Sequence, residues 1–596
     1  MAKNAAEQTL GELPRWDLSD LFPGSDSPEL TSALAQLGED AAAFRRDYEG
    51  KVARLSGAQL SAAIARCEAL EESLGRVTSY AQLVYSSNIS DPENARFFQS
   101  MQEQATALSA EMLFFTLEIN KLEDQELQAR LKDPGLAAYG PWLRDLRAFR
   151  PYQLPDDHEK LLHEKQITGR AAWNRLFDET MAGLTFELDG QSLSNAEILN
   201  RMSSPDGGVR ERAAKSFGKV LNDNIRLFSL VTNTLAKDKQ MEDCWRGFAA
   251  PVSSRNLANA VEDEVVEALV QSVVQAYPQL SHRYYQLKAR WLGKEKLPYW
   301  DRNAPLPNAD DRLIPWSEAQ AMVLDAYRSF SPDLANVGQR FFDSAWIDAP
   351  ARAGKAPGAF AHPTVPSAHP YLLLNYQGKV RDVMTLAHEL GHGVHQVLAA
   401  DQGYFLSQTP LTLAETASVF GEMLTFQSLL KNTSDPVARK VMLAGKVEDM
   451  LNTVVRQIAF HRFETEVHHA RQGGELLPKD LGEIWLRTQQ EALGPVFTFD
   501  EEYKTYWAYV PHFIHVPFYV YAYAFGDCLV NSLYAVYQDA EAGFAEKYLA
   551  MLSAGGVKRH KELLAPFGLD ASDPAFWRKG LQVISGLIDQ LEALED

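Results

Sequence analysis

The sequence predicts a mainly α protein with a small β element. Helical periodicity dominates it: apolar residues recur every three or four positions, opposite charged faces, in 29–72, 75–123, 210–245, 256–292, 316–342, 434–473 and 541–554. Strand signals are few, and the clearest are 184–188, before the turn Asp189-Gly190, and 371–376, before Gln377-Gly378. A chain of 596 residues is too long for one compact core, so we expect two or more lobes.

Connectors rich in proline and glycine separate the helical stretches, at 133–155, 203–208, 298–316 and 348–370. We place the domain boundary in the second connector, which gives an N-terminal helical lobe of residues 1–205 and a C-terminal domain of residues 206–596. The fourth connector directly precedes the strand 371–376. We expect it to be a long loop, and long loops in compact domains are usually functional or mobile.

Composition indicates an ordinary globular protein of a reducing compartment. Hydrophobic residues make up 46% of the chain and charged residues 23%, and the net charge of −21 with no basic tract excludes nucleic acid as the main partner. The three cysteines are far apart, and the start MAKNAAEQTLGELPRW lacks the apolar core of a signal peptide. The apolar stretch 513–537 is broken by polar residues. We therefore expect a cytoplasmic protein with no membrane partner, whose oligomeric state the sequence leaves open.

The run His388-Glu389-Leu390-Gly391-His392 is an H-E-x-x-H motif. On a helix, histidines four residues apart share one face, so both imidazoles can reach a single zinc ion, and Glu389 can act as general base. We expect this helix over 380–400, anchored by an apolar stripe of Val383, Leu386, Leu390, Val394 and Val397. The pattern predicts one zinc per chain. The alternative, a helix with two core histidines, leaves Glu389 unexplained.

Catalytic zinc needs a third protein ligand, and three residues compete for that role. His395 shares the helical face, but the longer H-E-x-x-H-x-x-G-x-x-H pattern is absent, so we interpret His395 as a neighbour of the site. Glu415 has a competing interpretation as part of a capping box with Thr412. Thr409-Pro410 is the better helix start, with proline at the first helical position and Glu415 inside the helix. Glu422, seven residues after Glu415 and on the same face, is the third candidate. We favour Glu415 as ligand and expect Glu422 to orient a ligand histidine.

These residues resemble a known family. The run HPYLLLNYQGKVRDVMTLAHELGHGVHQ and the following LAETASVFGEML are similar to the oligoendopeptidase F family of thimet-oligopeptidase-like zinc metallopeptidases. The likeness extends to the N-terminal LPRWDLSDLFPG and the late HFIHVPFYVYAYAFG. It implies a two-lobed, zincin-type helical body with a deep channel that admits oligopeptides and excludes folded proteins. It also implies that His388, His392 and Glu415 bind the zinc and that Glu389 is the base.

The resemblance further implies that a histidine and tyrosines near the C-terminal end contact the substrate and its developing oxyanion. His512 and Tyr519 are our first choices for these roles, and His515, Tyr521 and Tyr523 compete with them. The alternative for each tyrosine in this aromatic stretch is core packing.

The function that we predict is zinc-dependent endopeptidase action on short oligopeptides. Glu389 would deprotonate a zinc-bound water, which attacks the peptide carbonyl, and would then pass the proton to the leaving amine. We expect the exposed edge of the strand 371–376 to pair with the substrate backbone. The alternatives are a zinc carboxypeptidase of similar helical fold and a non-catalytic peptide-binding protein. A structural zinc site is disfavoured, because no cysteine lies near the motif.

Overall fold

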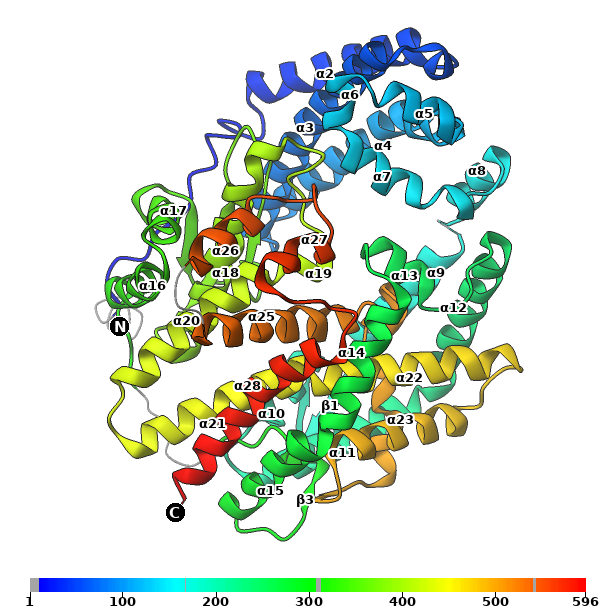
Figure 1. The fold of residues 1–596 in the computed structure, drawn as a ribbon. Coiled ribbons are helices and arrows are strands. Elements are labelled where there is room, and N and C mark those ends of the chain that lie inside the picture. The colour runs from blue at the N-terminus through cyan, green and yellow to red at the C-terminus, as the bar shows by residue number, and fades with distance from the viewer. Residues whose placement is uncertain (1–9, 167, 307–311, 540–542, 596) are drawn as a thin grey trace. The chain divides into compact units, whose positions relative to one another are not determined.

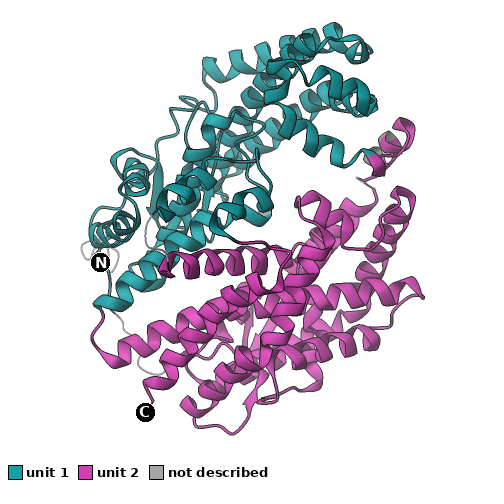
Figure 2. Ribbon diagram, viewed as in Figure 1, with its two compact units in different colours: residues 1–150, 311–432, 540–568 teal, residues 151–310, 433–539, 569–596 magenta. Residues whose placement is uncertain are grey.

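A computed structural model describes the chain apart from residues 1–9, 167, 307–311, 540–542 and 596 (Figure 1). Its described residues are mainly helical with three small sheets, which confirms the predicted fold class. The chain divides into two compact units (Figure 2). Unit 1 comprises 1–150, 311–432 and 540–568, and unit 2 comprises 151–310, 433–539 and 569–596. Each unit therefore combines segments that are far apart in the chain, and the boundary near residue 205 stays a prediction about sequence domains.

The N-terminal part of unit 1 is helical. Its elements are α2 (Pro28–Tyr48), η1 (Val52–Arg54), α3 (Gly57–Ser87), α4 (Pro92–Lys121), α5 (Asp124–Arg130), α6 (Pro134–Ala138) and α7 (Gly140–Ala148), followed by η2 (Arg150–Tyr152). The stretch 29–72, expected as one helical region, is divided between α2 and α3. The cause is a capping box at Ser56: its side chain accepts from the Gln59 N–H, and the Gln59 side chain accepts from the Ser56 N–H.

The remainder of unit 1 surrounds a three-stranded sheet. Its helices are α16 (Trp316–Phe330), α17 (Pro332–Asp343), α18 (Val380–Ala399), η5 (Ala400–Gln402), α19 (Leu411–Ala414), α20 (Thr416–Asn432), α26 (Phe544–Leu552), α27 (His560–Leu564) and η7 (Ala565–Phe567). The predicted helical stretch 316–342 is broken between α16 and α17. Ser331 caps α17 through the Leu334 N–H, and Pro332 occupies the first turn, where its missing N–H is harmless.

The sheet of unit 1 corrects two predictions. Its strands are β4 (Ile347–Pro350), β5 (Phe360–His362) and β6 (Tyr371–Tyr376), in the order β4-β6-β5. The predicted strand 371–376 is β6, but it is the central strand, parallel to β4 and antiparallel to β5, so its edges are not available to a substrate. The connector 348–370, expected to be a loop, contains β5 and the end of β4. These strands are too short to carry a period-2 signal.

Unit 2 contains a second helical assembly with two minimal sheets, β1-β2 and β3-β7. Its first segment contains α8 (Asp156–Lys165), α9 (Arg170–Gly183), β1 (Phe186–Leu188), β2 (Gln191–Leu193), α10 (Asn195–Arg201), α11 (Gly207–Asp223), α12 (Ile225–Arg246), α13 (Ser253–Ala258), α14 (Asp263–Ala276), η3 (Tyr277–Gln279), α15 (Ser281–Trp291), β3 (Leu297–Pro298) and η4 (Tyr299–Asp301). The later segments contain α21 (Pro436–Thr453), α22 (Val455–Gln472), α23 (Pro478–Leu493), β7 (Phe497–Thr498), η6 (Glu501–Tyr509), α24 (His512–His515), α25 (Tyr521–Asp539) and α28 (Pro574–Ala593).

The core of unit 2 is rich in aromatic side chains. Phe217, Trp485 and Trp507 are buried there, and the rings of Tyr503 and Tyr506 lie 4.9 Å apart. Such rings bury large apolar areas and favour tilted or edge contacts. None of the described helices in either unit is long and apolar enough to cross a membrane.

Candidate metal centre

A close helix crossing in unit 1 brings the motif histidines to Glu415. The motif helix α18 spans Val380–Ala399, within one residue of the expected range, and packs against α20. Gly391 permits this approach, because a Cβ at that position would lie 2.5 Å from the Ala417 carbonyl oxygen and 2.6 Å from the Ser418 Cα. Leu386 and Leu390 of the predicted apolar stripe are fully buried. The stripe thus anchors α18, and the glycine sets its distance from α20.

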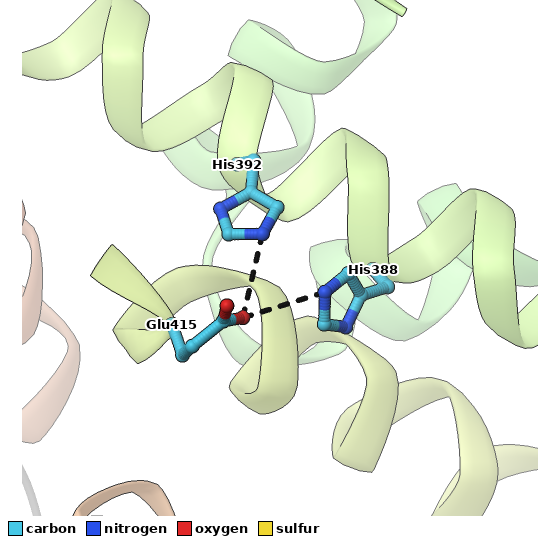
Figure 3. A group of neighbouring side chains, drawn as sticks. All are labelled: His388, His392 and Glu415. Atoms are coloured by element: carbon cyan, nitrogen blue, oxygen red, sulfur yellow. Dashed lines mark ion pairs between the residues drawn. The ribbon is translucent and has the colours of Figure 1, made fainter. Parts of the chain in front are cut away.

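His388, His392 and Glu415 form one compact group of potential metal ligands (Figure 3). Oε2 of Glu415 lies 3.4 Å from Nε2 of His388 and 3.4 Å from Nε2 of His392. Ligand atoms about 2.1 Å from a tetrahedral zinc ion stand about 3.4 Å from one another. The two distances from Glu415 therefore match the spacing of zinc ligands, and all three ligand atoms lie within 4.8 Å of one another. Three protein ligands would leave a fourth position for water.

Two further side chains hold this group in place. Nδ1 of His388 lies 3.2 Å from Oε2 of Glu422, the residue expected to orient a ligand histidine. The Ser418 hydroxyl donates a hydrogen bond of 2.7 Å to Oε2 of Glu415. A carboxylate behind a ligand imidazole fixes the ring orientation and makes the ring a stronger ligand.

The electrostatics of the group favour a cation. Burial opposes a charge on His388, but the carboxylates of Glu415 and Glu422 outweigh it and raise the imidazole pKa to about 10. Burial likewise opposes ionisation of Glu415, but its hydrogen bonds to the two imidazoles hold its pKa well below the usual range. The electrostatic potential between the three side chains is therefore negative, which favours the binding of a divalent cation.

Glu389 follows the first ligand histidine directly in the chain and is not part of the potential ligand group. Its carboxyl group is buried, with 7% of the residue exposed, and its pKa is raised mainly by this burial. The neighbouring His388 and His392, and to a smaller extent the backbone of Ala361, act in the opposite direction. Ala361 is the middle residue of β5, and this edge strand packs against α18, the helix that carries Glu389.

His395, the histidine considered as a third ligand, is not part of the ligand group. His395 is buried, its Nε2 lies 3.2 Å from the Thr409 hydroxyl, and burial lowers its pKa to about 4. It is thus a partnered neighbour of the cluster.

Glu415 lies at the junction of α19 and α20, and Pro410 is the N-cap of α19 and not its first residue. The expected position of Glu415 inside one helix is therefore wrong, because the chain breaks into two helices there.

The residues expected to contact substrate lie in unit 2 and form a cluster of their own. The rings of His512 and Tyr519 are 6.1 Å apart, and Nε2 of His512 lies 3.2 Å from the Tyr523 hydroxyl. His515 instead contacts Asp178, at 2.8 Å, and Tyr521 is fully buried. Among the competitors, Tyr523 is therefore the one that the fold groups with the first choices.

A cavity of about 560 Å³ adjoins the metal cluster within unit 1. His392 and His395 are among its lining residues, and the rest of the wall mixes polar residues with apolar ones such as Val365, Pro366 and Val397. This size is typical of a site for a side chain or a small molecule. Sequence reasoning did not identify the cavity, nor the contact of Ser418, because a common hydroxyl carries no sequence signal.

Comparison with known proteins places these features in a family context. Residues 201–583 match the model of peptidase family M3, and residues 118–186 match the oligopeptidase F model. The chain is 26% identical over 595 residues to oligopeptidase PepF of Bacillus subtilis (strain 168), covering 97% of this chain and 87% of that protein. It is 24% identical to an oligoendopeptidase F homolog of Borreliella burgdorferi, covering 98% and 99% of the two chains.

Solved structures share the fold. The structure of a putative peptidase from Chlamydophila abortus superposes with a TM-score of 0.84 at 22% identity, covering 98% of this chain and all of the other. Oligoendopeptidase-F from Enterococcus faecium superposes with a TM-score of 0.73 at 22% identity, covering 96% of this chain and all of the other.

Proposed function

Because the chain belongs to peptidase family M3 and is a metalloendopeptidase, we propose that it hydrolyses internal bonds of oligopeptides with one zinc ion held by His388, His392 and Glu415. The family assignment confirms the resemblance seen in the sequence and sets aside the non-catalytic alternative. The observation that supports the zinc site most directly is the pair of 3.4 Å distances that join Glu415 to the two imidazoles.

We assign proton transfer to Glu389. A bound zinc ion supplies a Lewis acid that polarises water and the scissile carbonyl. Glu389 accepts the proton of the attacking water and later delivers it to the leaving amine. Its raised pKa suits both steps, because a carboxylate with a higher pKa is a stronger base and still releases its proton to an amine.

The substrate backbone is proposed to pair with β5 and not with β6. β5 is an edge strand of the sheet and packs against α18, the helix that carries Glu389. An extended peptide added to such an edge is held by main-chain hydrogen bonds, which tolerate many side chains. The cavity of about 560 Å³ beside His392 then offers room for one substrate side chain.

The experiment that tests this proposal compares Glu389→Gln with the unmodified enzyme. The amide has the shape of the carboxyl group but cannot take a proton, so we expect zinc content to stay near one per chain and peptide cleavage to be lost. Glu39→Gln, an exposed position on α2, is the matched control and should cleave normally. Cleavage by Glu389→Gln at the control rate would refute the assigned mechanism.

The choice of substrate distinguishes endopeptidase action from the carboxypeptidase alternative. An internally quenched peptide with both ends blocked can be cut only by an endopeptidase, so its cleavage is expected here. The product masses from a mixed peptide library would at the same time define the length limit and the side-chain preference. Cleavage confined to free C-terminal residues would refute endopeptidase action.

A further inference from the structure

Unit 2 contains a cavity of about 280 Å³ that no step of peptide hydrolysis uses. Half of its lining residues are aromatic, with Trp300, Trp485 and Tyr503 among them, and two arginines, Arg302 and Arg456, also line it. The same two arginines border a second, much smaller cavity. Both arginines therefore border internal space as well as packed side chains.

Arg456 has unused hydrogen-bonding capacity at this cavity. Its Nη2 donates to the Tyr509 hydroxyl at 2.5 Å, and its guanidinium carbon lies 4.9 Å from the ring centre of Phe460. Its Nε is buried and has no hydrogen-bond partner among the described residues. The neutral hydroxyl and the ring do not compensate the charge, and a buried donor without an acceptor is unfavourable.

The carboxylates close to the cavity are already engaged by other cations. Asp301, fully buried, accepts hydrogen bonds from Arg210, one of them 2.7 Å long, and from Lys294. Among the described residues, no carboxylate forms an ion pair with Arg302 or Arg456. This part of the wall thus carries more positive charge than its own carboxylates neutralise.

The carboxylate of Glu448 does not neutralise this excess of positive charge. Its Oε1 accepts hydrogen bonds from Lys288, at 2.5 Å, and from the Tyr284 hydroxyl, at 2.7 Å. Burial lowers the pKa of Lys288, and the Arg302 cation lowers it further. Burial also lowers the pKa of Arg456, with Arg302 again contributing. Lys288 and Arg456 are therefore both repelled by Arg302. This local excess of positive charge occurs in a chain whose net charge is −21.

We propose that this cavity binds a small organic carboxylate, held by Arg302 and Arg456. A guanidinium group presents a planar fork of donors that matches a carboxylate, and the unpaired donor of Arg456 is one that such a ligand would satisfy. The tryptophan and tyrosine rings of the wall suit an organic body attached to the charge. This inference does not depend on the metal cluster of unit 1.

The test measures the melting temperature of the full-length enzyme with N-acetylphenylalanine and with its neutral amide. We expect a saturable rise of about 1 °C or more with the acid and none with the amide, because a ligand that binds only the folded state stabilises it. Arg302→Gln should need at least about ten times more acid for the same rise. Arg175→Gln, an exposed arginine of α9 paired with Glu179, is the control and should respond like the unmodified enzyme.

A His388→Ala variant separates this site from the metal cluster. Retention of the acid response in His388→Ala, with its loss in Arg302→Gln, supports the cavity; the reverse result refutes it and leaves the zinc proposal intact. An equal response to acid and amide also refutes it, without any variant. Should Arg302→Gln fail to fold, Arg302→Lys keeps the charge without the fork and is expected to weaken the response. A response to phosphate but not to the acid would refute the carboxylate assignment.

Discussion

The contact between α18 and α20 gives the sharpest prediction, because one glycine sets the position of a metal ligand. In Gly391→Ala, the added Cβ would lie 2.5 Å from the Ala417 carbonyl oxygen, where ordinary contact begins at 3.4 Å. That oxygen belongs to the backbone of α20 and has no side-chain freedom, so α20 must retreat by about 1 Å. Glu415 immediately precedes this helix and moves with it.

A displacement of this size exceeds what a zinc site tolerates. Distances in such sites hold to about 0.2 Å, so a retreat of about 1 Å removes Glu415 from effective coordination. We expect zinc affinity to fall at least about 100-fold, with a parallel loss of peptide cleavage at limiting zinc. Overpacking should also lower the free energy of unfolding by about 1–3 kcal/mol, partly offset by the better helix propensity of alanine.

The assay is competition with a zinc chelator, together with cleavage of a quenched peptide at fixed free zinc. Gly445→Ala is the matched control, since Gly445 lies in the helix α21 and a Cβ there meets nothing within 4 Å. It should retain zinc and gain slightly in stability. If Gly391→Ala binds zinc as tightly as Gly445→Ala, the reasoning about the helix crossing is wrong.

Three further predictions concern other contacts. Glu422→Ala removes the carboxylate behind His388, so zinc affinity should fall about 10–100-fold in chelator competition, and an unchanged affinity would contradict the orienting role. Tyr519→Phe should lower kcat by about 10²–10³ if its hydroxyl stabilises the oxyanion, while Tyr521→Phe, at a fully buried tyrosine, should leave kcat nearly unchanged; equal effects would argue for core packing. Burial raises the pKa of Glu464 to about 8, so its folded form binds a proton more tightly than its unfolded form. This stability is complete below about pH 4.5 and is lost as the pH rises through 8. Urea unfolding should therefore show the unmodified enzyme losing about 2 kcal/mol relative to Glu464→Gln between pH 6.5 and 8, and parallel curves would contradict this.

The helices and the motif could be predicted because they depend on local order. The spacing of His388 and His392 places both on one helical face whatever surrounds them, and the apolar stripe through Leu386 and Leu390 determines which face is buried. For the same reason the limits of α18 agree with the sequence to within one residue. Breaks such as the one before Pro332 carry a local signal too, although the periodicity alone does not show it.

The tertiary structure alone decided everything that joins distant parts of the chain. The order β4-β6-β5, the packing of β5 against α18, and the excess of cations around Arg302 and Arg456 follow from packing between segments tens or hundreds of residues apart. The hydrophobic periodicity of a segment does not predict such contacts, because the same pattern is compatible with several tertiary arrangements of that segment. The sequence by itself thus determined the helical class, the family and the H-E-x-x-H chemistry. The fold decided which strand lies at the edge, how close α20 comes to α18, and where positive charge is not neutralised by nearby carboxylates.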